Sequence, residues 1–597
     1  MKNKYTKIYS KMQKLNFNYQ PNDLQRIFVE KGLELLYKDT IDSYRLRLHN
    51  PKSIIEELVN NCISARNGHL TNNEYTINTA SETRKILEKK EDALNFQTIS
   101  REYYLELLKS VKKQHYNVVI QASNLILKEN RNYQELLIQK LEEYFQNYDP
   151  EKDLFESDIK HFLLIVHYLI IEYINLGYTK QYLYHYFRTI FVYTGDNLLT
   201  FNNRFEIWKN LCIKEKEKFT VIVEILGESF QHKTLQSINS NYTPVNARFR
   251  NLIPESTSEK VRNYLEEKKN SNLIALELKA LDHFKSIELA RSIIASDLDI
   301  YHLGYNNQLF RIDDNGAIIG SIQPEKASTV PINYQLDGYI RSSKKVFNKS
   351  LEKIKLLKIN NVSEESIDKI ISAVRYLRTG SESPELETKL LNYWIGLEYI
   401  FTLFNSQEKT IDVMRRYLPT CHGVIYIKRN LYDFHKALKR IGISHQIEEY
   451  NDNMQYLTKF RTYDEIKGAS TNQLIKFRSS FYQKLVSDPS NINRSLEKHQ
   501  ENLIWNITRL YKIRNEIVHN AAVTDNISVN VSHLKYYLTF ILNSLMDFMS
   551  NSPIDIDGDQ KITIEDYFIS QTIIFGALKG QKVNEYLKVN NPMESLS

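Results

Sequence analysis

Through most of the chain, apolar residues recur every three to four positions, the spacing of one face of an α-helix. The run over 24–36 is an example. An α-helix has 3.6 residues per turn, so this spacing predicts amphipathic helices packed against a core. Asp149-Pro150 interrupts the pattern, because the residue before a proline is disfavoured in the helical conformation. We therefore expect a first helical region over 1–150 and a second over 151–296.

One later segment departs from the helical pattern. Asn315-Gly316 lies between two short runs of β-prone residues. Asn-Gly supplies the positive φ angles of a tight type I′ turn, so the segment predicts a β-hairpin. We expect a small β insert over 297–345 that joins helical modules, and a ligand-binding sheet is the less favoured alternative. With 597 residues, the chain is predicted to be mainly α-helical and multidomain.

The helical pattern resumes after residue 345 and predicts a bundle over 346–550, followed by a polar tail over 551–597. Within the bundle, the sequence after Ser383-Pro384 has apolar residues at alternating spacings of four and three. Glu398 is the charged member of an otherwise apolar row beside that stripe. Burying a carboxylate without a partner is costly, so this position calls for a cation.

A second helix of the bundle supplies the cation. Leu503, Ile507 and Leu510 recur at helical spacing, and Arg514 continues the same line. An arginine at such a position pairs with a buried acid or binds a phosphate group. The sequence continues from Arg514 through Asn515 and reaches His519 five positions later.

Charge, cysteine content and targeting signals narrow the class of protein. The 79 basic residues against 72 acidic residues give a net charge of +7, which neither requires nor excludes a nucleic-acid partner. Three distant cysteines exclude a disulfide scaffold or a CxxC zinc site. The most apolar stretch, 162–171, is interrupted by His167 and is shorter than the ~20 residues that span a bilayer. Because the first 20 residues are polar, we expect no signal peptide. We expect a cytoplasmic protein without a membrane partner.

Arg-Asn-x-x-x-His on a late helix, after an earlier helix that carries Leu397-Glu398, resembles the HEPN superfamily and most closely its Apea-like branch from prokaryotic defence proteins. The resemblance covers about residues 365–550. It implies a C-terminal HEPN helical bundle and a metal-independent ribonuclease that leaves a 2′,3′-cyclic phosphate. The substrate would be RNA, with tRNA among the candidates. A role as a toxin or as an effector of abortive infection in antiviral defence, released by a phage-derived trigger, follows by analogy.

The residue types fit this chemistry. RNA cleavage needs a base for the 2′-hydroxyl proton, an acid for the leaving 5′-oxygen and a cation for the charged phosphorane. His519 titrates near neutral pH and can transfer protons, and Arg514 presents a fork of donors to phosphate oxygens. Asn515 shares a helix face with His519 and can orient it or hold a phosphate oxygen. These three residues are the predicted catalytic set, with Glu398 in support.

One copy of the motif supplies only one histidine. Arg514 and His519 lie about 140° apart around a helix and ~7.5 Å apart along it, so one chain makes a splayed site. A twofold-related copy would complete it, which predicts a homodimer through the HEPN bundle. Two alternatives remain open: Arg514 pairs with Glu398 for structural reasons only, or the bundle is an inactive HEPN scaffold that binds partners.

An acidic segment near the C-terminus resembles a calcium loop. Asp555, Asp557 and Asp559 occupy the first, third and fifth positions, and Asp566 stands where the usual pattern has glutamate. Gln560 stands at the position that usually holds the turn glycine. We favour a solvated acidic turn over a calcium site. The sequence shows neither a Gly-rich phosphate loop nor a dinucleotide fingerprint, and we expect neither a cofactor nor a metal requirement.

Overall fold

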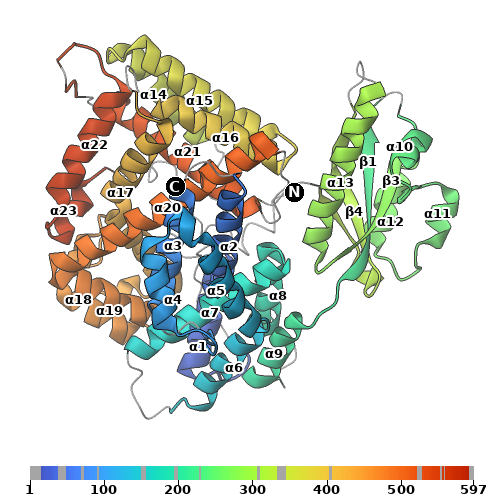
Figure 1. The fold of residues 1–597 in the computed structure, drawn as a ribbon, viewed down its shortest axis with the longest axis horizontal. Coiled ribbons are helices and arrows are strands. Elements are labelled where there is room, and N and C mark those ends of the chain that lie inside the picture. Colours follow the sequence, from blue (N-terminus) through green and yellow to red (C-terminus); the bar gives the residue numbers. More distant parts are fainter. Residues whose placement is uncertain are drawn as a thin grey trace.

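The computed structural model describes residues 15, 17–37, 49–68, 73–89, 93–149, 156–193, 199–227, 230–304, 310–332, 336, 344–402, 407–520, 527–551, 554–556 and 558–590. Helices dominate these residues, and five antiparallel strands form a sheet. The prediction of a mainly α-helical, multidomain protein is therefore confirmed. Figure 1 shows a large helical body beside a smaller module that contains the sheet.

The helical body is built from two groups of helices that are widely separated in the sequence. The first group contains α1 (Asp23–Leu36), α2 (Pro51–Arg66), α3 (Glu74–Leu87), α4 (Arg101–Leu107), α5 (Tyr116–Glu129), α6 (Tyr133–Gln146), α7 (Glu156–Leu176), α8 (Lys180–Arg188) and α9 (Phe201–Lys209). The second group contains α14 (Lys344–Ile359), α15 (Glu364–Glu382), α16 (Leu386–Phe401), α17 (Thr410–Ile441), α18 (Phe460–Ala469), α19 (Gln473–Ser487), α20 (Pro489–Asn520), α21 (Ser528–Ser550), α22 (Ile564–Leu578) and α23 (Val583–Lys588).

One hydrophobic core runs through both groups. It joins Leu24 and Phe205 of the first group to Leu397 and Leu545 of the second, and all four side chains are almost fully buried. Helix α3 packs against α20, and α1 packs against α19. The predicted helical domains therefore do not have separate cores, which corrects the boundaries at residues 150 and 346. Helical periodicity marks the buried face of a helix but does not indicate which other helix covers it.

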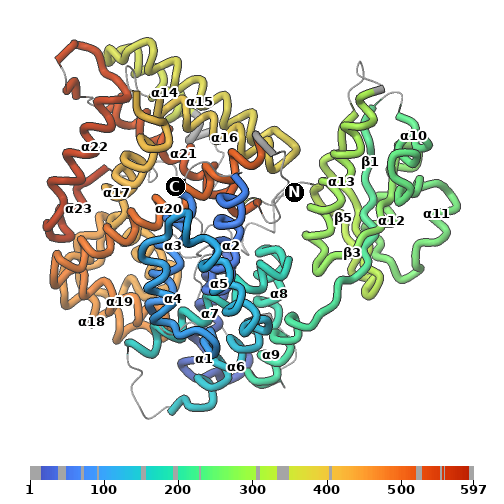
Figure 2. The backbone as a smooth tube through the Cα atoms, in the orientation of Figure 1, coloured from blue at the N-terminus to red at the C-terminus, as the bar shows by residue number. Residues whose placement is uncertain are grey.

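The smaller module spans residues 217–332, between the two groups in the sequence. Its strands are β1 (Glu217–Leu226), β2 (Tyr242–Pro244), β3 (Leu273–Ala280), β4 (Arg311–Gly320) and β5 (Ser328–Pro331), in the order β2-β3-β1-β4-β5. Its helices are α10 (His232–Ile238), α11 (Ala247–Leu252), α12 (Glu259–Glu267) and α13 (His283–Gly304). Figure 2 shows the backbone leaving the helical body after α9 and entering this module.

Helices cover both faces of the sheet. Val221 and Val223 of β1 belong to an apolar cluster with α10 and α13, whereas the intervening Ile222 belongs to a second cluster with α12. Neither cluster is part of the core of the helical body. The module therefore has its own core, in two layers on either side of the sheet.

The sheet corrects the predicted β insert over 297–345 and the predicted helical region over 151–296. Strands β1, β2 and β3 all lie before residue 297. Strand β1 is the central strand, and its residues 221–223 are completely buried. A strand that is buried on both faces reads as a continuous apolar run, which is easily taken for part of a buried helix.

Asn315-Gly316 does not form the predicted hairpin turn. Both residues lie within β4, where Gly316 is opposite Val223 of β1 and Val330 of β5. A Cβ atom at Gly316 would lie 2.5 Å from the carbonyl oxygen of Ile222. The pairing of β1 with β4 also shifts register just beyond this point. The glycine is thus required by a close approach of two strands at an irregularity.

The module is anchored to the helical body by a buried carboxylate. Asp282, which precedes α13, accepts hydrogen bonds from the backbone nitrogen and hydroxyl of Thr179 at 2.8 and 3.1 Å. Burial raises the pKa of Asp282 to about 6 against the effect of these hydrogen bonds. A second link runs from Arg291 of α13 to the carbonyl oxygen of Pro384, at 3.2 Å.

Residues 551–597 are not the predicted polar tail, as far as they are described. Helices α22 and α23 pack against α17. The ring of Phe568 on α22 is buried and stacks on Phe401 and Tyr417 with centroid distances of 4.9 and 4.8 Å. The final helices therefore belong to the helical body.

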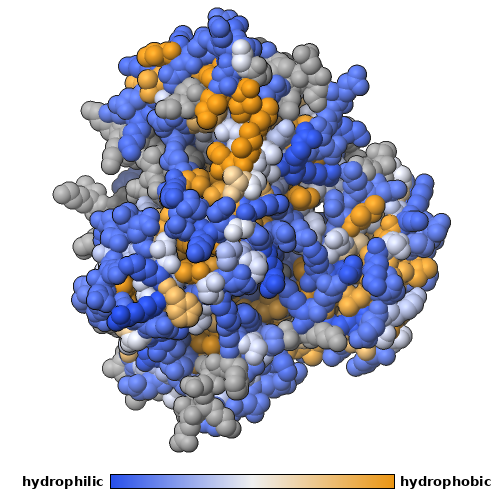
Figure 3. Space-filling view, turned by 90° about the vertical axis from the view of Figure 1, so that its left-hand side faces the viewer, coloured by the Kyte–Doolittle hydropathy of each residue, from blue (hydrophilic) through white to orange (hydrophobic). Residues whose placement is uncertain are grey.

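Helix α7 is the one described helix that is long and apolar enough, by length and composition, to cross a membrane. It packs against α1 and α6, and its Phe162, Tyr168 and Tyr173 are completely buried. The packing is that of a core helix. Figure 3 shows a mostly hydrophilic face with an apolar stripe in its upper half.

Candidate functional site

The two helices that carry the predicted site residues are α16 and α20. Leu503, Ile507 and Leu510 of α20 are buried in the core, as their spacing predicts. Further along α20, the ring of Tyr511 stacks on Trp394 of α16 with a centroid distance of 5.5 Å. This contact sets the two helices side by side just before the Arg514 motif.

Arg514 and Glu398 come together across α20 and α16, as the sequence predicts. Nη2 of Arg514 lies 3.9 Å from Oε1 of Glu398, and the two side chains are 26% and 30% exposed. An ion pair with this separation and exposure contributes about 1 kcal/mol or less to stability. The pair orients the guanidinium weakly and leaves part of it accessible to a phosphate group.

Asn515 is held by two partners. Its Oδ1 accepts a hydrogen bond from Nη1 of Arg514 at 3.0 Å. Its Nδ2 donates to the hydroxyl oxygen of Tyr75 at 3.1 Å. Tyr75 lies in the first turn of α3 and was not predicted. No sequence signal indicates it, because Tyr75 and Asn515 are 440 positions apart.

His519 lies in the last turn of α20, so its backbone is helical. Its side chain lies outside what the structure describes, and its predicted role in proton transfer stays a prediction. The described part of the site therefore comprises Arg514, Asn515, Glu398 and Tyr75.

Arg509 is a charged residue of α20 that the sequence analysis did not single out. It donates to Glu57 of α2 and to Glu82 of α3 with N–O distances of 2.6–3.0 Å. Burial opposes ionisation of Glu57, but Arg509 and His49 outweigh it and hold the pKa of Glu57 well below its usual range. The three charged groups are largely buried, so N-terminal helices are fixed to the motif helix one turn before Arg514.

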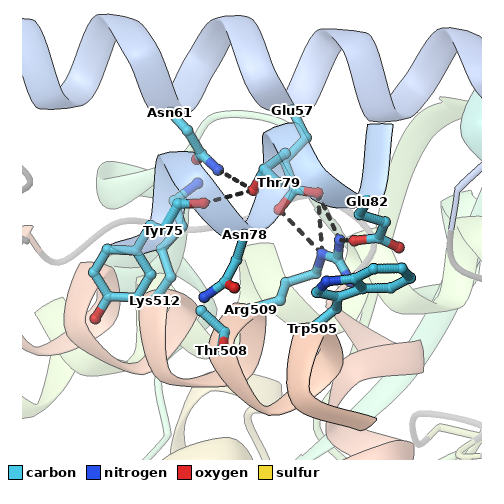
Figure 4. Close-up of a pocket in the computed structure, with 10 residues that line it drawn as sticks. All are labelled: Glu57, Asn61, Tyr75, Asn78, Thr79, Glu82, Trp505, Thr508, Arg509 and Lys512. Carbon is cyan, nitrogen blue, oxygen red and sulfur yellow. Dashed lines mark hydrogen bonds and ion pairs between the residues drawn. The ribbon is translucent and has the colours of Figure 1, made fainter. Parts of the chain in front are cut away.

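A small pocket adjoins this cluster (Figure 4). It is lined by residues of α2, α3 and α20: Glu57, Asn61, Tyr75, Asn78, Thr79, Glu82, Trp505, Thr508, Arg509 and Lys512. Figure 4 shows Arg509 directed at the two glutamates, and Asn61 donates to Thr79 at 2.8 Å. Because its arginine is neutralised by two carboxylates, the pocket has no net attraction for a phosphate group.

The predicted acidic turn is organised by backbone hydrogen bonds. Asp555 accepts from the backbone nitrogens of Gly558 and Gln560 at 2.7 and 2.8 Å. Asp566 is buried and accepts from the backbone of Thr563 and Ile556, at 2.8 and 3.0 Å. Asp557 lies outside the described residues.

Gln560 has a φ of +67°, so it adopts the left-handed conformation that a glycine usually supplies at this position of a calcium loop. Among the described residues, no group of three or more His, Cys, Asp or Glu side chains is placed to hold a metal ion.

No protein-family model, curated protein or solved structure matches the chain.

Proposed function

We propose that the chain is a metal-independent endoribonuclease of the HEPN type. The observation that carries the proposal is the pairing of Arg514 with Asn515 near the end of α20, beside Glu398 of α16. A partly exposed guanidinium is held there one turn before a histidine position, on the two helices that the motif predicts. This arrangement supports phosphate binding beside a proton-transferring group.

In the proposed reaction, the RNA strand is cleaved by its own 2′-hydroxyl. A base removes the 2′-hydroxyl proton, the 2′-oxygen attacks the adjacent phosphorus, and the bond to the 5′-oxygen breaks. The 5′-oxygen takes a proton from an acid, which leaves a 2′,3′-cyclic phosphate. His519 transfers protons, and the Arg514 guanidinium stabilises the charge that grows on the phosphorane oxygens.

A homodimer supplies the second histidine in this proposal. Base and acid act on opposite sides of the phosphorus, whereas one chain carries the motif once. Two chains related by a twofold axis would surround one phosphate with two arginines and two histidines. RNA, including tRNA, is the proposed substrate. By analogy with the family resemblance, the enzyme would serve as a cytoplasmic toxin or antiphage effector.

The experiment incubates full-length protein with RNA or tRNA in EDTA. Wild type should cleave, and Arg514→Ala and His519→Ala should each lower the rate by about 10²–10³-fold or more. Arg416→Ala and His445→Ala are matched controls, because both side chains are exposed and neither belongs to the predicted site. Full activity in both motif variants would contradict the assignment of activity to this site.

One observation favours the alternative of an inactive scaffold. Glu398, Asn515 and Tyr75 already provide partners for Arg514 and its neighbour, which is what a structural arginine would have. A scaffold predicts no RNA cleavage by wild type and a lowered melting temperature for Arg514→Ala. The enzyme predicts cleavage by wild type and an Arg514→Ala protein that stays folded.

A further inference from the structure

A chain of polar contacts crosses three helices at the motif. It runs from Glu398 on α16 to Arg514 and Asn515 on α20, and ends at Tyr75 on α3. The contacts measure 3.9, 3.0 and 3.1 Å in that order. The last member comes from the N-terminal group of helices, far from the motif in the sequence.

Asn515 accepts one of its two hydrogen bonds and donates the other. Its carbonyl oxygen faces a guanidinium donor, and its amide nitrogen faces a hydroxyl oxygen. A rotated amide would place its NH₂ group against the guanidinium, which can only donate, so Arg514 selects the orientation in which the Asn515 carbonyl accepts. In that orientation the amide nitrogen is left to donate to the Tyr75 hydroxyl oxygen, which anchors the amide in place. Burial raises the pKa of Tyr75 and so favours the neutral hydroxyl group, whose oxygen can accept the hydrogen bond from Asn515.

Tyr75 is itself immobilised against α20. Its side chain is 5% exposed, and its ring lies 6.1 Å from the ring of Tyr511. The adjacent Glu74 accepts from Arg415 of α17 at 2.7 Å. Further along α3, Glu82 accepts from Arg509 of α20 at 2.6 Å. Helix α3 is thus fixed on both sides of the hydroxyl group that Asn515 contacts.

From this geometry we infer that Tyr75 is a positioning residue of the ribonuclease site, supplied by the N-terminal helices. Its hydroxyl group holds the Asn515 amide, and the amide carbonyl holds the Arg514 guanidinium in the direction that receives the phosphate. The inference rests on the proposed ribonuclease function. It also gives the N-terminal helices a part in forming the site.

The test is a double-mutant cycle in the full-length protein with Tyr75→Phe and Asn515→Ala. Phenylalanine keeps the ring packing and removes only the hydroxyl group. Tyr75→Phe should lower kcat about tenfold, comparable to the loss of one hydrogen bond, and leave KM within about twofold. In the Asn515→Ala background, Tyr75→Phe should have no further effect on kcat, because Tyr75 acts through Asn515.

Tyr116→Phe is the matched control. Tyr116 is as deeply buried, and its hydroxyl group donates to Asn73, the residue before α3, at 3.0 Å. It lies outside the contacts that reach Arg514, so this variant should lose some stability and keep its kcat. Melting temperatures of all variants separate a loss of positioning from a loss of folded protein.

The outcomes distinguish the two proposals. If wild type cleaves RNA in a His519-dependent manner but Tyr75→Phe has wild-type kcat, the inference about Tyr75 is overturned and the function stands. The inference would also be overturned if Tyr75→Phe lowered kcat by the same factor in wild type and in the Asn515→Ala background. If wild type shows no His519-dependent cleavage, the proposed function fails and the inference fails with it.

Discussion

Arg509 on α20 and Glu57 on α2 form a bidentate pair in which Nε lies 3.0 Å from Oε1 and Nη2 lies 2.9 Å from Oε2. The two residues are 452 positions apart, and their side chains are 9% and 13% exposed. Glu82 contributes a second carboxylate to the same guanidinium. The helix that carries the Arg514 motif is therefore joined to the N-terminal helices by largely buried charge.

Removal of this guanidinium should be costly. Arg509→Met keeps most of the side-chain volume but leaves the carboxylates of Glu57 and Glu82 without their arginine. We expect the free energy of unfolding to fall by about 3–5 kcal/mol, as for other broken buried pairs. Urea denaturation followed by circular dichroism measures the change. Arg416→Met removes an arginine from an exposed pair with Glu408 and should change stability by about 0.5 kcal/mol or less. Equal effects of the two substitutions would show that burial does not matter here.

A fragment of residues 346–597 should not fold by itself. Its helices share one core with the first group, so the fragment would expose the face of α20 that α3 covers and the face of α19 that α1 covers. We expect a poorly soluble or loosely packed species that binds a hydrophobic dye. Sedimentation, near-ultraviolet circular dichroism and dye fluorescence check this. A soluble fragment with a cooperative unfolding transition would contradict the shared core.

Buried histidines should make the helical body sensitive to acid. Nε2 of His499 lies 2.8 Å from Nδ1 of His422, and Nε2 of His422 lies 2.7 Å from the hydroxyl group of Tyr536. Burial, with Arg429 nearby, lowers the pKa of His499 to about 3. The unfolded chain binds this proton below about pH 6.5 and the folded chain does not, so the contribution of His499 is present above pH 6.5 and is lost as pH falls towards 3.

Comparison of variants isolates that contribution from the other titrating groups. Stability measured by urea denaturation should fall less between pH 7 and pH 4 for His499→Gln than for wild type, although His499→Gln is less stable at pH 7. His445→Gln removes an exposed histidine and should keep the pH dependence of wild type. Parallel curves for wild type and His499→Gln would show that folding does not lower the pKa of His499.

A methyl group at position 316 should destabilise the sheet module. The Cβ of Gly316→Ala would lie against the Ile222 carbonyl oxygen, and backbone in a central strand cannot easily move aside. We expect a loss of about 1–3 kcal/mol, seen as faster hydrogen exchange in 217–332 with little change elsewhere. Gly468→Ala in α18 is the control, because its Cβ meets open space and alanine favours a helix. Unchanged exchange in Gly316→Ala would contradict the close approach.

The correct predictions concern features that depend on residues close together in the sequence. The apolar line of Leu503, Ile507 and Leu510 was predicted because helical periodicity is local. The pairing of Glu398 with Arg514 was predicted because a charge in an apolar row needs an opposite charge, and Arg514 continues an apolar row on a second helix. In both cases a short stretch of sequence was enough to predict the buried face of the helix and the charge that would face it.

The errors concern contacts that no local pattern encodes. Tyr75 and Glu57 lie in helices whose polar faces look solvated in the sequence, and only the tertiary packing brings them to α20. Asn315-Gly316 carries a turn signal, but the strand continues because β1 and β5 pair with it on both sides. Long-range pairing overrides the local preference at that point.

Because the sheet module separates the two groups of helices in the sequence, the order of synthesis constrains when these two groups can pack together. Helices α2 and α3 leave the ribosome long before α20. Another 452 residues must be added after Glu57 before its partner Arg509 is synthesised. At about 5–20 residues per second, roughly 20–90 s pass between the two. Meanwhile the 217–332 module, which has its own core, can fold. A nascent chain that stalls before α20 therefore carries no motif, and the proposed ribonuclease site can form only after α20 has been synthesised.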